Sequence, residues 1–379
     1  MQNKLFKIIG FCTLVLGIFF FQKTVLAAEL YLSPENDLIN QGQTVVVELR
    51  LDSRKEIINA VQGRMTYDPQ ILEFVEVSKA GTFLSLWPEE PKADTAAGVI
   101  TFAGGAPNGS YVINGRVLAV VFKGKNLGSS KVSIDNGTSG VYLNDGLGTK
   151  AELNVKSATI TVQIPTSTIN LTSPTHPDEN TWYKAKDVKF TWSVTQDAFY
   201  AYVFGVDPAA LPDERIATHL GEISYSNVDD GIHYFILKEK LPNDKWGPSI
   251  RMRVQIDSTL PESIIYQLTQ DVVPGKLVLV FSAKDRVSQI VKYQIIEGNQ
   301  ITDNAISPYT LKNQKQSQVI TIKAFDSAGN LQEAVIPGVK TASTATQYLW
   351  PIAIGFSLVI LVIILVVYWP KKPKRNLVK

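Results

Sequence analysis

The sequence predicts an all-β chain that ends in one membrane-spanning helix. Two observations predict the β class: apolar residues recur at every second position, and clusters of Asn, Asp and Gly separate these runs. The clearest runs are Val45, Val47, Leu49 and Leu51, then Leu118, Val120 and Phe122, and then Ala158, Ile160, Val162 and Ile164. A third observation predicts the helix, because residues 349–369 contain only one clearly polar side chain, Ser357. At about 1.5 Å per residue this segment would span about 31 Å, the thickness of a bilayer core.

The two ends of the chain predict export followed by anchoring. Lys4 and Lys7 precede an apolar run at 8–21, and Ala27 and Ala28 are the small residues expected at a secretory cleavage site. Aromatic residues flank the apolar segment near the C-terminus, and five basic residues follow it, so the positive-inside rule places that tail in the cytoplasm. We therefore expect a single-pass protein of the cell membrane with its N-terminal ectodomain outside. The segments are a signal peptide at 1–28, a tether at 339–347, a transmembrane helix at 348–369 and a cytoplasmic basic tail at 370–379.

Charge and cysteine content exclude other classes. Eight of the 37 basic residues lie in the predicted signal peptide or tail, which leaves 29 against 35 acidic residues between positions 29 and 347. The resulting net charge of −6 argues against a nucleic-acid partner. Cys12, the single cysteine, lies in the signal peptide, so the exported part would be stable without disulfides.

Turn clusters and a composition change divide the exported part into three blocks. We expect a first domain at 29–163, a linker at 164–172, a second domain at 173–258 and a third at 259–338. In the second block, Val188, Phe190, Trp192 and Val194 alternate on one strand face, and its pattern resembles fibronectin-III or immunoglobulin-like modules with Trp192 in the core. The third block ends as the second does, in an alternating strand and an Asp/Asn/Gly turn, which predicts tandem immunoglobulin-like units.

The first block carries a series of motifs in a fixed order. They lie at 42–47, at 65–77 with Tyr67-Asp68-Pro69, at 98–105, at 115–123 and in a final strand at 158–162. On these motifs the block resembles the cohesin domains of bacterial surface proteins. The resemblance implies a nine-stranded jelly-roll sandwich, related to carbohydrate-binding modules, that binds a partner protein through one sheet face. That partner is commonly a dockerin, a small module that carries its own calcium, in complexes that degrade polysaccharides. The chain has one such block and neither a sortase signal nor a surface-layer homology module, which weakens the link to polysaccharide degradation but not the one to surface display.

Local chemistry predicts the role of several short segments. Pro69 lacks an amide hydrogen, and the Asp68 side chain accepts turn hydrogen bonds, so this pair ends a strand. Gly104-Gly105 is typical of a tight connection more than of a contact site. Glu89-Glu90, between Pro88 and Pro91, indicates an exposed loop. Asp326 and Asn330 favour a solvated turn over calcium ligands, because they match no full calcium loop.

The sequence offers no catalytic constellation. All three histidines, His176, His219 and His233, lie in the second block, and no spacing fixes two acids across a cleft. We therefore predict that the chain is not an enzyme, and we assign no catalytic, cofactor-binding or metal-binding residue to it.

Three functions stay open at this stage. The first block binds a protein, or it binds carbohydrate directly as its structural cousins do, or the chain is an adhesive or structural stalk with no specific ligand. Carbohydrate binding would need exposed, coplanar aromatic rings. The candidate ligand-binding residues are Trp87, Tyr111, Tyr142, Trp182 and Tyr183, with Tyr31 as a further aromatic of the first block.

Overall fold

The structure, a computed structural model, describes residues 27–164, 169–240, 244–270, 275–338, 354–355 and 357–364. Its described residues between 27 and 338 form strands and turns without a helix, which confirms the all-β prediction for them. The chain divides into two compact units, Met1–Ser258 and Thr259–Lys379. The first unit contains two sandwiches and the second unit contains one.

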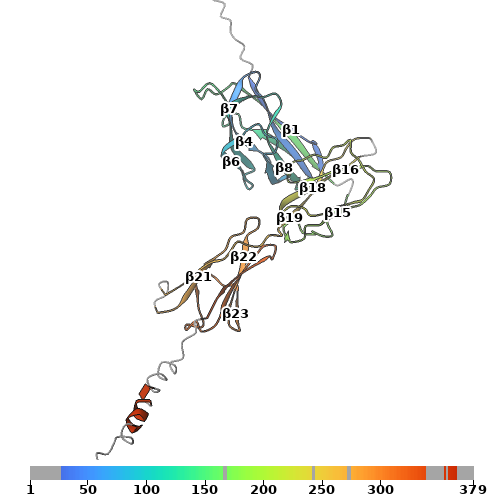
Figure 1. The fold of residues 1–379 in the computed structure, drawn as a ribbon. Coiled ribbons are helices and arrows are strands. Elements are labelled where there is room, and N and C mark those ends of the chain that lie inside the picture. Colours follow the sequence, from blue (N-terminus) through green and yellow to red (C-terminus); the bar gives the residue numbers. More distant parts are fainter. Residues whose placement is uncertain are drawn as a thin grey trace, which may run out of the picture. The chain divides into compact units, whose positions relative to one another are not determined.

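The first sandwich consists of a five-stranded and a seven-stranded sheet (Figure 1). The five-stranded sheet has the order β11 (Leu153–Lys156), β1 (Ala28–Pro34), β3 (Thr44–Asp52), β8 (Gly115–Gly124) and β5 (Leu72–Ser78). The other has the order β2 (Leu38–Asn40), β12 (Ala158–Gln163), β9 (Gly128–Ile134), β4 (Ile57–Thr66), β7 (Val99–Tyr111) and β6 (Leu86–Asp94), and β10 (Gly140–Leu143) also pairs with β4. These are twelve strands instead of the nine implied by the resemblance. The short strands β2, β10 and β11 account for the difference, and each pairs backbone groups of a longer strand.

Period-two alternation places most residues of the predicted strand faces in the core between these sheets, but Ile164, the last residue of the third predicted run, is 67% exposed. Val45, Val47, Leu49 and Leu51 of β3 face Leu118, Val120 and Phe122 of β8 across the ladder, and all seven are fully buried. Each fully buried aliphatic side chain of this size contributes about 1.5–3 kcal/mol. Val75 of β5 is 45% exposed, because the register of β5 shifts between Phe74 and Glu76.

The second sandwich has a three-stranded and a four-stranded sheet. The first has the order β13 (Leu171–Thr172), β15 (Val188–Trp192) and β17 (Glu222–Tyr225), and the second has the order β14 (Trp182–Tyr183), β19 (Ile250–Ile256), β18 (Gly231–Glu239) and β16 (Tyr200–Gly205). Because Leu171 pairs with Trp192, this sandwich begins within the expected linker at 164–172. Phe190 stacks on Phe235 with ring centroids 4.2 Å apart, and Trp192 is 5% exposed, so its predicted place in the core is confirmed.

The second unit repeats the three-plus-four arrangement. Its sheets have the orders β20 (Ile265–Thr269), β21 (Val278–Ser282), β24 (Tyr309–Thr310) and β23 (Gln300–Asp303), β22 (Ile290–Glu297), β25 (Ile320–Asp326), β26 (Leu331–Ile336). Asp326 and Asn330, at the two ends of the turn after β25, are buried, which corrects the expectation that they lie in a solvated turn, and residues 327–329 between them are partly or fully exposed. Asn330 donates to the Asp326 carboxylate from its backbone nitrogen and its side-chain amide, both at 2.8 Å, and both residues are at least 96% buried. These bonds compensate the burial of the carboxylate.

Residues 354–355 and 357–364 are helical, and the large apolar side chains among them are about half exposed. No helix within the described residues has both the length and the apolar character needed to cross a bilayer. Several predicted segments lie outside the described residues. They are the remainder of the predicted span at 348–369, the predicted tether, the basic tail, and all but the last two residues of the predicted signal peptide.

Candidate functional site

The second sandwich covers the outer face of the five-stranded sheet. Val46 of β3 and Ala119 and Val121 of β8 point away from the first sandwich's own core, yet they are at most 1% exposed. They pack in one cluster with Ala209 of the second sandwich. We call this contact the seam. It covers the central part of one of the two outer faces of the first sandwich.

A group of buried charges lies at the seam. The carboxylate of Glu35, directly after β1, accepts from Lys238 Nζ at 3.1 Å and from Arg251 Nη2 at 3.4 Å, and these three side chains are only 3%, 7% and 5% exposed. The Ser249 hydroxyl also donates to Glu35. Since a buried charge is unfavourable without partners, the first sandwich needs the second to compensate Glu35.

Burial by itself would raise the pKa of Glu35, but the charges of Arg251 and Lys238 and the hydrogen bond from Ser249 outweigh it, so the pKa lies below its usual value. Burial also lowers the pKa of Arg251, against the opposing effect of Glu35. An arginine remains protonated throughout the physiological range. The pair is therefore ionised at neutral pH.

Acid should loosen the seam. The pKa of Glu35 is lower in the folded state than in the unfolded state, where it is about 4.3. Such a carboxyl group stabilises the folded state when the pH is above the unfolded pKa, and this stabilisation is lost as the pH falls through the folded pKa. We expect amide hydrogen exchange in β19 and β5 to accelerate, after correction for the intrinsic rate, as the pH falls from 5 to 3. A Glu35→Gln variant should lack the acceleration that comes from protonation of Glu35. If exchange in the variant accelerated equally between pH 5 and 3, Glu35 would not be the group whose protonation loosens the seam.

Further polar contacts extend the seam on both sides of the charge group. Ser78 Oγ donates to Asp207 Oδ1 at 2.6 Å, and the Tyr234 hydroxyl donates to Glu76. Burial, together with the neighbouring Glu76 carboxylate, raises the pKa of Tyr234, so its hydroxyl remains a donor at neutral pH. These contacts connect the two sandwiches of the first unit.

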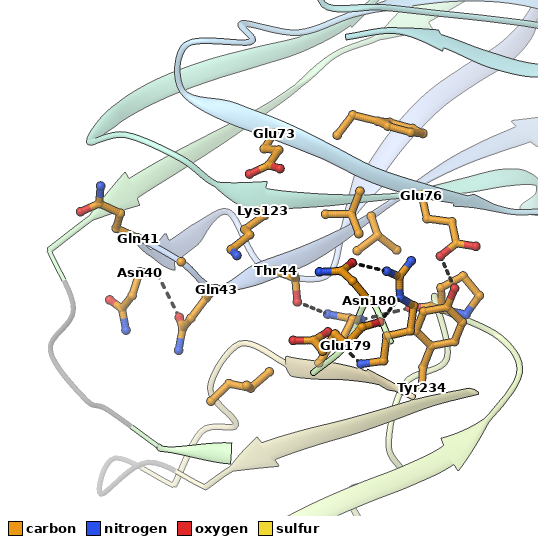
Figure 2. Close-up of a pocket in the computed structure, with 18 of the residues that line it drawn as sticks. Asn40, Gln41, Gln43, Thr44, Glu73, Glu76, Lys123, Glu179, Asn180 and Tyr234 are labelled. Atoms are coloured by element: carbon orange, nitrogen blue, oxygen red, sulfur yellow. Dashed lines mark hydrogen bonds between the residues drawn. The ribbon is translucent and has the colours of Figure 1, made fainter. Parts of the chain in front are cut away.

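A cavity of about 660 Å³, the seam pocket, opens beside the charge group (Figure 2). In the figure, Glu73 and Lys123 of the first sandwich lie on one side, and Glu179, Asn180 and Tyr234 of the second lie on the other. The remaining lining residues are Asn40, Gln41, Gly42, Gln43, Thr44, Phe74, Val75, Glu76, Val121, Ile169, Pro208, Ile250, Arg251 and Arg253.

The outer face of the seven-stranded sheet, here called the open face, has a different character. Its residues pair directly across three strands, in the rows Arg64–Thr101–Lys92, Gln62–Ala103–Glu89 and Ala60–Gly105–Leu86. Arg64, Gln62, Glu89, Lys92 and Leu86 are exposed, and the floor between them consists of small residues. A Cβ atom added at Gly105 would meet no heavy atom closer than 3.6 Å. The rim of the open face is therefore exposed and predominantly polar, while its floor is partly buried and Gly105 is buried.

Two adjacent predictions for this sheet are wrong. Gly104 and Gly105 lie within β7 and form no turn. Gly104 faces inward, where a Cβ would lie 2.6 Å from Leu84 Cδ1 and 3.2 Å from the Trp87 ring, so close side-chain packing explains this glycine. Glu89 and Glu90 lie in β6 and not in a loop, because β6 is an edge strand and tolerates the prolines beside them.

The predicted aromatic residues do not form one platform. Trp87 packs against the core and stands 6.5 Å from Phe102 in an edge-on arrangement. Tyr111 and Tyr142 both lie beside the first half of β4, where Tyr111 pairs with Ile57 and Tyr142 with Ala60. Trp182 and Tyr183 belong to the second sandwich, where Tyr183 accepts a hydrogen bond from the Asp178 backbone and its ring packs edge-on against His176. Tyr31 donates to Asn114.

The three histidines have structural partners. His176 Nε2, His219 Nδ1 and His233 Nε2 lie 3.0, 2.8 and 2.8 Å from the backbone oxygens of Ala185, Ala198 and Asp229. Burial lowers the pKa of His176, although its bond to Ala185 opposes the shift. In the second unit, carboxylate oxygens of Asp285 and Asp326 approach within 4.8 Å of each other. Both residues already accept backbone hydrogen bonds, Asp285 from Val287 and Ser288 and Asp326 from Asn330.

Among proteins of known structure, solved cohesin modules are similar to part of this chain. No family model matches it, and neither does any curated protein. A non-cellulosomal cohesin of Archaeoglobus fulgidus is 15% identical, with a TM-score of 0.30, over 36% of this chain and 92% of its own. The seventh type I ScaB cohesin of Pseudobacteroides cellulosolvens is 19% identical, with a TM-score of 0.31, over 37% and 95%. A type I cohesin of Clostridium thermocellum, solved in complex with a dockerin, is 12% identical, with a TM-score of 0.32, over 37% and 95%.

Proposed function

We propose that this chain is a membrane-anchored recognition protein whose first sandwich is a cohesin-like domain that binds a partner protein through the open face. One observation carries the proposal: the first sandwich has two outer faces, and the seam occupies one of them. The open face remains accessible within the first unit. Its small central residues, Ala60, Ala103 and Gly105, let a partner's backbone approach closely, and Arg64, Glu89 and Lys92 provide polar contacts.

A dockerin-bearing protein is the partner that we propose. The motifs from Gly42 to Val162 resemble those of cohesins, and such a partner brings its own calcium, so the present chain needs none. The link to polysaccharide degradation would then come from what the dockerin-bearing protein carries.

The remaining parts of the chain serve display in this proposal. A helix that exposes apolar side chains all round, as residues 357–364 do, suits a lipid environment, and the basic tail would lie on the cytoplasmic side. The sandwich of the second unit would be an immunoglobulin-like spacer. The second sandwich would be a fixed part of the recognition head, because it covers Glu35.

Direct carbohydrate binding at the open face has less support. On an open sheet face, with no cavity to enclose the sugar, such a site needs exposed aromatic rings in one plane, and Trp87, the largest candidate in this sheet, packs inward. Tyr111 is 55% exposed, but it lies at the end of β7 beside Ile57.

A Gly105→Arg substitution should abolish partner binding and leave the fold intact. The new side chain has room at its Cβ and would project from the floor of the open face. We expect capture of a calcium-dependent partner from secreted protein of the source organism to fall at least tenfold, measured with the immobilised chain in the presence and absence of chelator.

Gly205→Arg is the matched control. Gly205 lies in β16 of the second sandwich, and its Cβ position has nothing within 4 Å, so it too has room for a side chain. This variant should retain full binding. If the Gly105→Arg chain captured the partner as well as the unaltered chain does, binding at the open face would be refuted. If capture were unaffected by both substitutions and by chelator, binding of a calcium-loaded partner at the open face would be refuted as well.

A further inference from the structure

We propose that the seam pocket is a second binding site, for a short neutral oligosaccharide. Its volume of about 660 Å³ lies within the range of small-molecule sites, about 300–1,000 Å³, and boundaries between domains are common places for such sites. One wall comes from β5 and the 40–44 turn of the first sandwich. The other comes from β18, β19 and residues 179–180 of the second (Figure 2).

The balance of charge selects a neutral ligand. The lining contains three carboxylates, Glu73, Glu76 and Glu179, and three cations, Lys123, Arg251 and Arg253. Three of these six charged groups have partners within the protein: Arg251 pairs with Glu35, Tyr234 donates to Glu76, and the backbone nitrogen of Arg253 donates to Glu179 at 2.9 Å. An ionic ligand of either sign would meet like charges in the same pocket, which is unfavourable.

The uncompensated groups are donors and acceptors spaced around one wall. Glu73 and Lys123 are cross-strand neighbours with exposed side chains, and within the described residues neither has an ion-pair partner. Asn40 Oδ1 accepts from Gln163 at 3.1 Å, and Gln43 Oε1 accepts from the Asn40 backbone at 3.0 Å. Within the described residues the amide NH₂ groups of Asn40 and Gln43 donate no hydrogen bond, so both can donate to a ligand, Gln43 more readily because Asn40 is only 7% exposed (Figure 2).

A sugar hydroxyl donates one hydrogen bond and accepts others, so a polyhydroxyl ligand satisfies the Glu73 carboxylate, the Lys123 ammonium group and both amides at once. Apolar surface for the C–H faces of the rings comes from Val75, which is turned outward by the irregularity in β5, and from Ile250. Tyr234 is 6% exposed, so recognition depends on polar groups more than on ring stacking. This site is separate from the open face.

The test uses the full chain in a detergent without a sugar headgroup. Binding is measured by calorimetry and by saturation-transfer NMR with five ligands. Four are neutral tetrasaccharides, of β-1,4-glucose, β-1,4-xylose, α-1,4-glucose and β-1,4-N-acetylglucosamine, and the fifth is an uncharged tetrapeptide. We expect at least one saccharide to bind, and the double variant Glu73→Gln/Lys123→Gln to bind it at least tenfold more weakly.

The matched control is Lys323→Gln/Glu333→Gln, which removes another cross-strand Lys–Glu pair, in the second unit, and should bind as the unaltered chain does. Gly105→Arg should also leave saccharide binding unchanged, which separates this site from the open face. The proposal is overturned if no saccharide binds, if only the peptide binds, or if the Glu73/Lys123 variant retains full affinity.

Discussion

Replacing Glu35 by Gln should destabilise the seam by about 3–5 kcal/mol, the usual effect of removing one partner from a buried ion pair. The substitution keeps the size of the side chain but leaves Arg251, 5% exposed, without its anionic partner. Lys238 keeps Glu214 at 3.2 Å, which places the expected loss toward the lower end of the range. The loss of stability would be measured by amide hydrogen exchange of the full chain, which should become faster in Ile250–Ile256 and Leu72–Ser78.

The matched control for this prediction is Glu90→Gln. Glu90 forms an ion pair of 2.6 Å with Lys79, but the two side chains are 65% and 40% exposed, so solvent screens the interaction. Its loss should change stability by no more than about 1 kcal/mol. If both variants exchange alike, the buried charges do not hold the two sandwiches together.

The sequence predicted the strand faces well, because alternation in a strand depends on local order alone. Val45 to Leu51 and Leu118 to Phe122 all reach the core as expected. The seam was missed, since Glu35 lies more than 200 positions from Lys238 and Arg251, and no local pattern links an exposed-looking acid to bases so far along the chain. The local signal nearest to the seam is Lys238, which directly follows the apolar residues Phe235, Ile236 and Leu237 of β18.

Glycines show the same limit of local inference. Gly104-Gly105 resembled a turn because paired glycines favour turns, yet Gly104 is required by Leu84 and Trp87, which come from another segment. The same holds for the motif glycine Gly98. It lies thirty positions beyond Tyr67-Asp68-Pro69, and only the fold shows that the two motifs touch: the Tyr67 backbone nitrogen donates to the Gly98 oxygen at 2.9 Å.

Gly98→Ala should therefore destabilise the first sandwich by about 2–5 kcal/mol. Gly98 has a φ of +65°, which is unfavourable by about 1–2 kcal/mol for a residue with a Cβ. The added Cβ would also lie 2.3 Å from the Tyr67 carbonyl oxygen and 2.7 Å from Pro69 Cδ, and overpacking of this kind costs about 1–3 kcal/mol. Urea unfolding followed by tryptophan fluorescence would measure the change.

Gly146→Ala separates the two contributions. Gly146 has a similar φ of +73°, but its Cβ position has no heavy atom within 4 Å, so only the backbone conformation is penalised. We expect a loss of about 1–2 kcal/mol there, and the difference between the variants then measures the contact between the two motifs. If the two variants lost equal stability, the backbone would relax around Tyr67 and Pro69. Glycine would then be needed at position 98 only because of its positive φ angle.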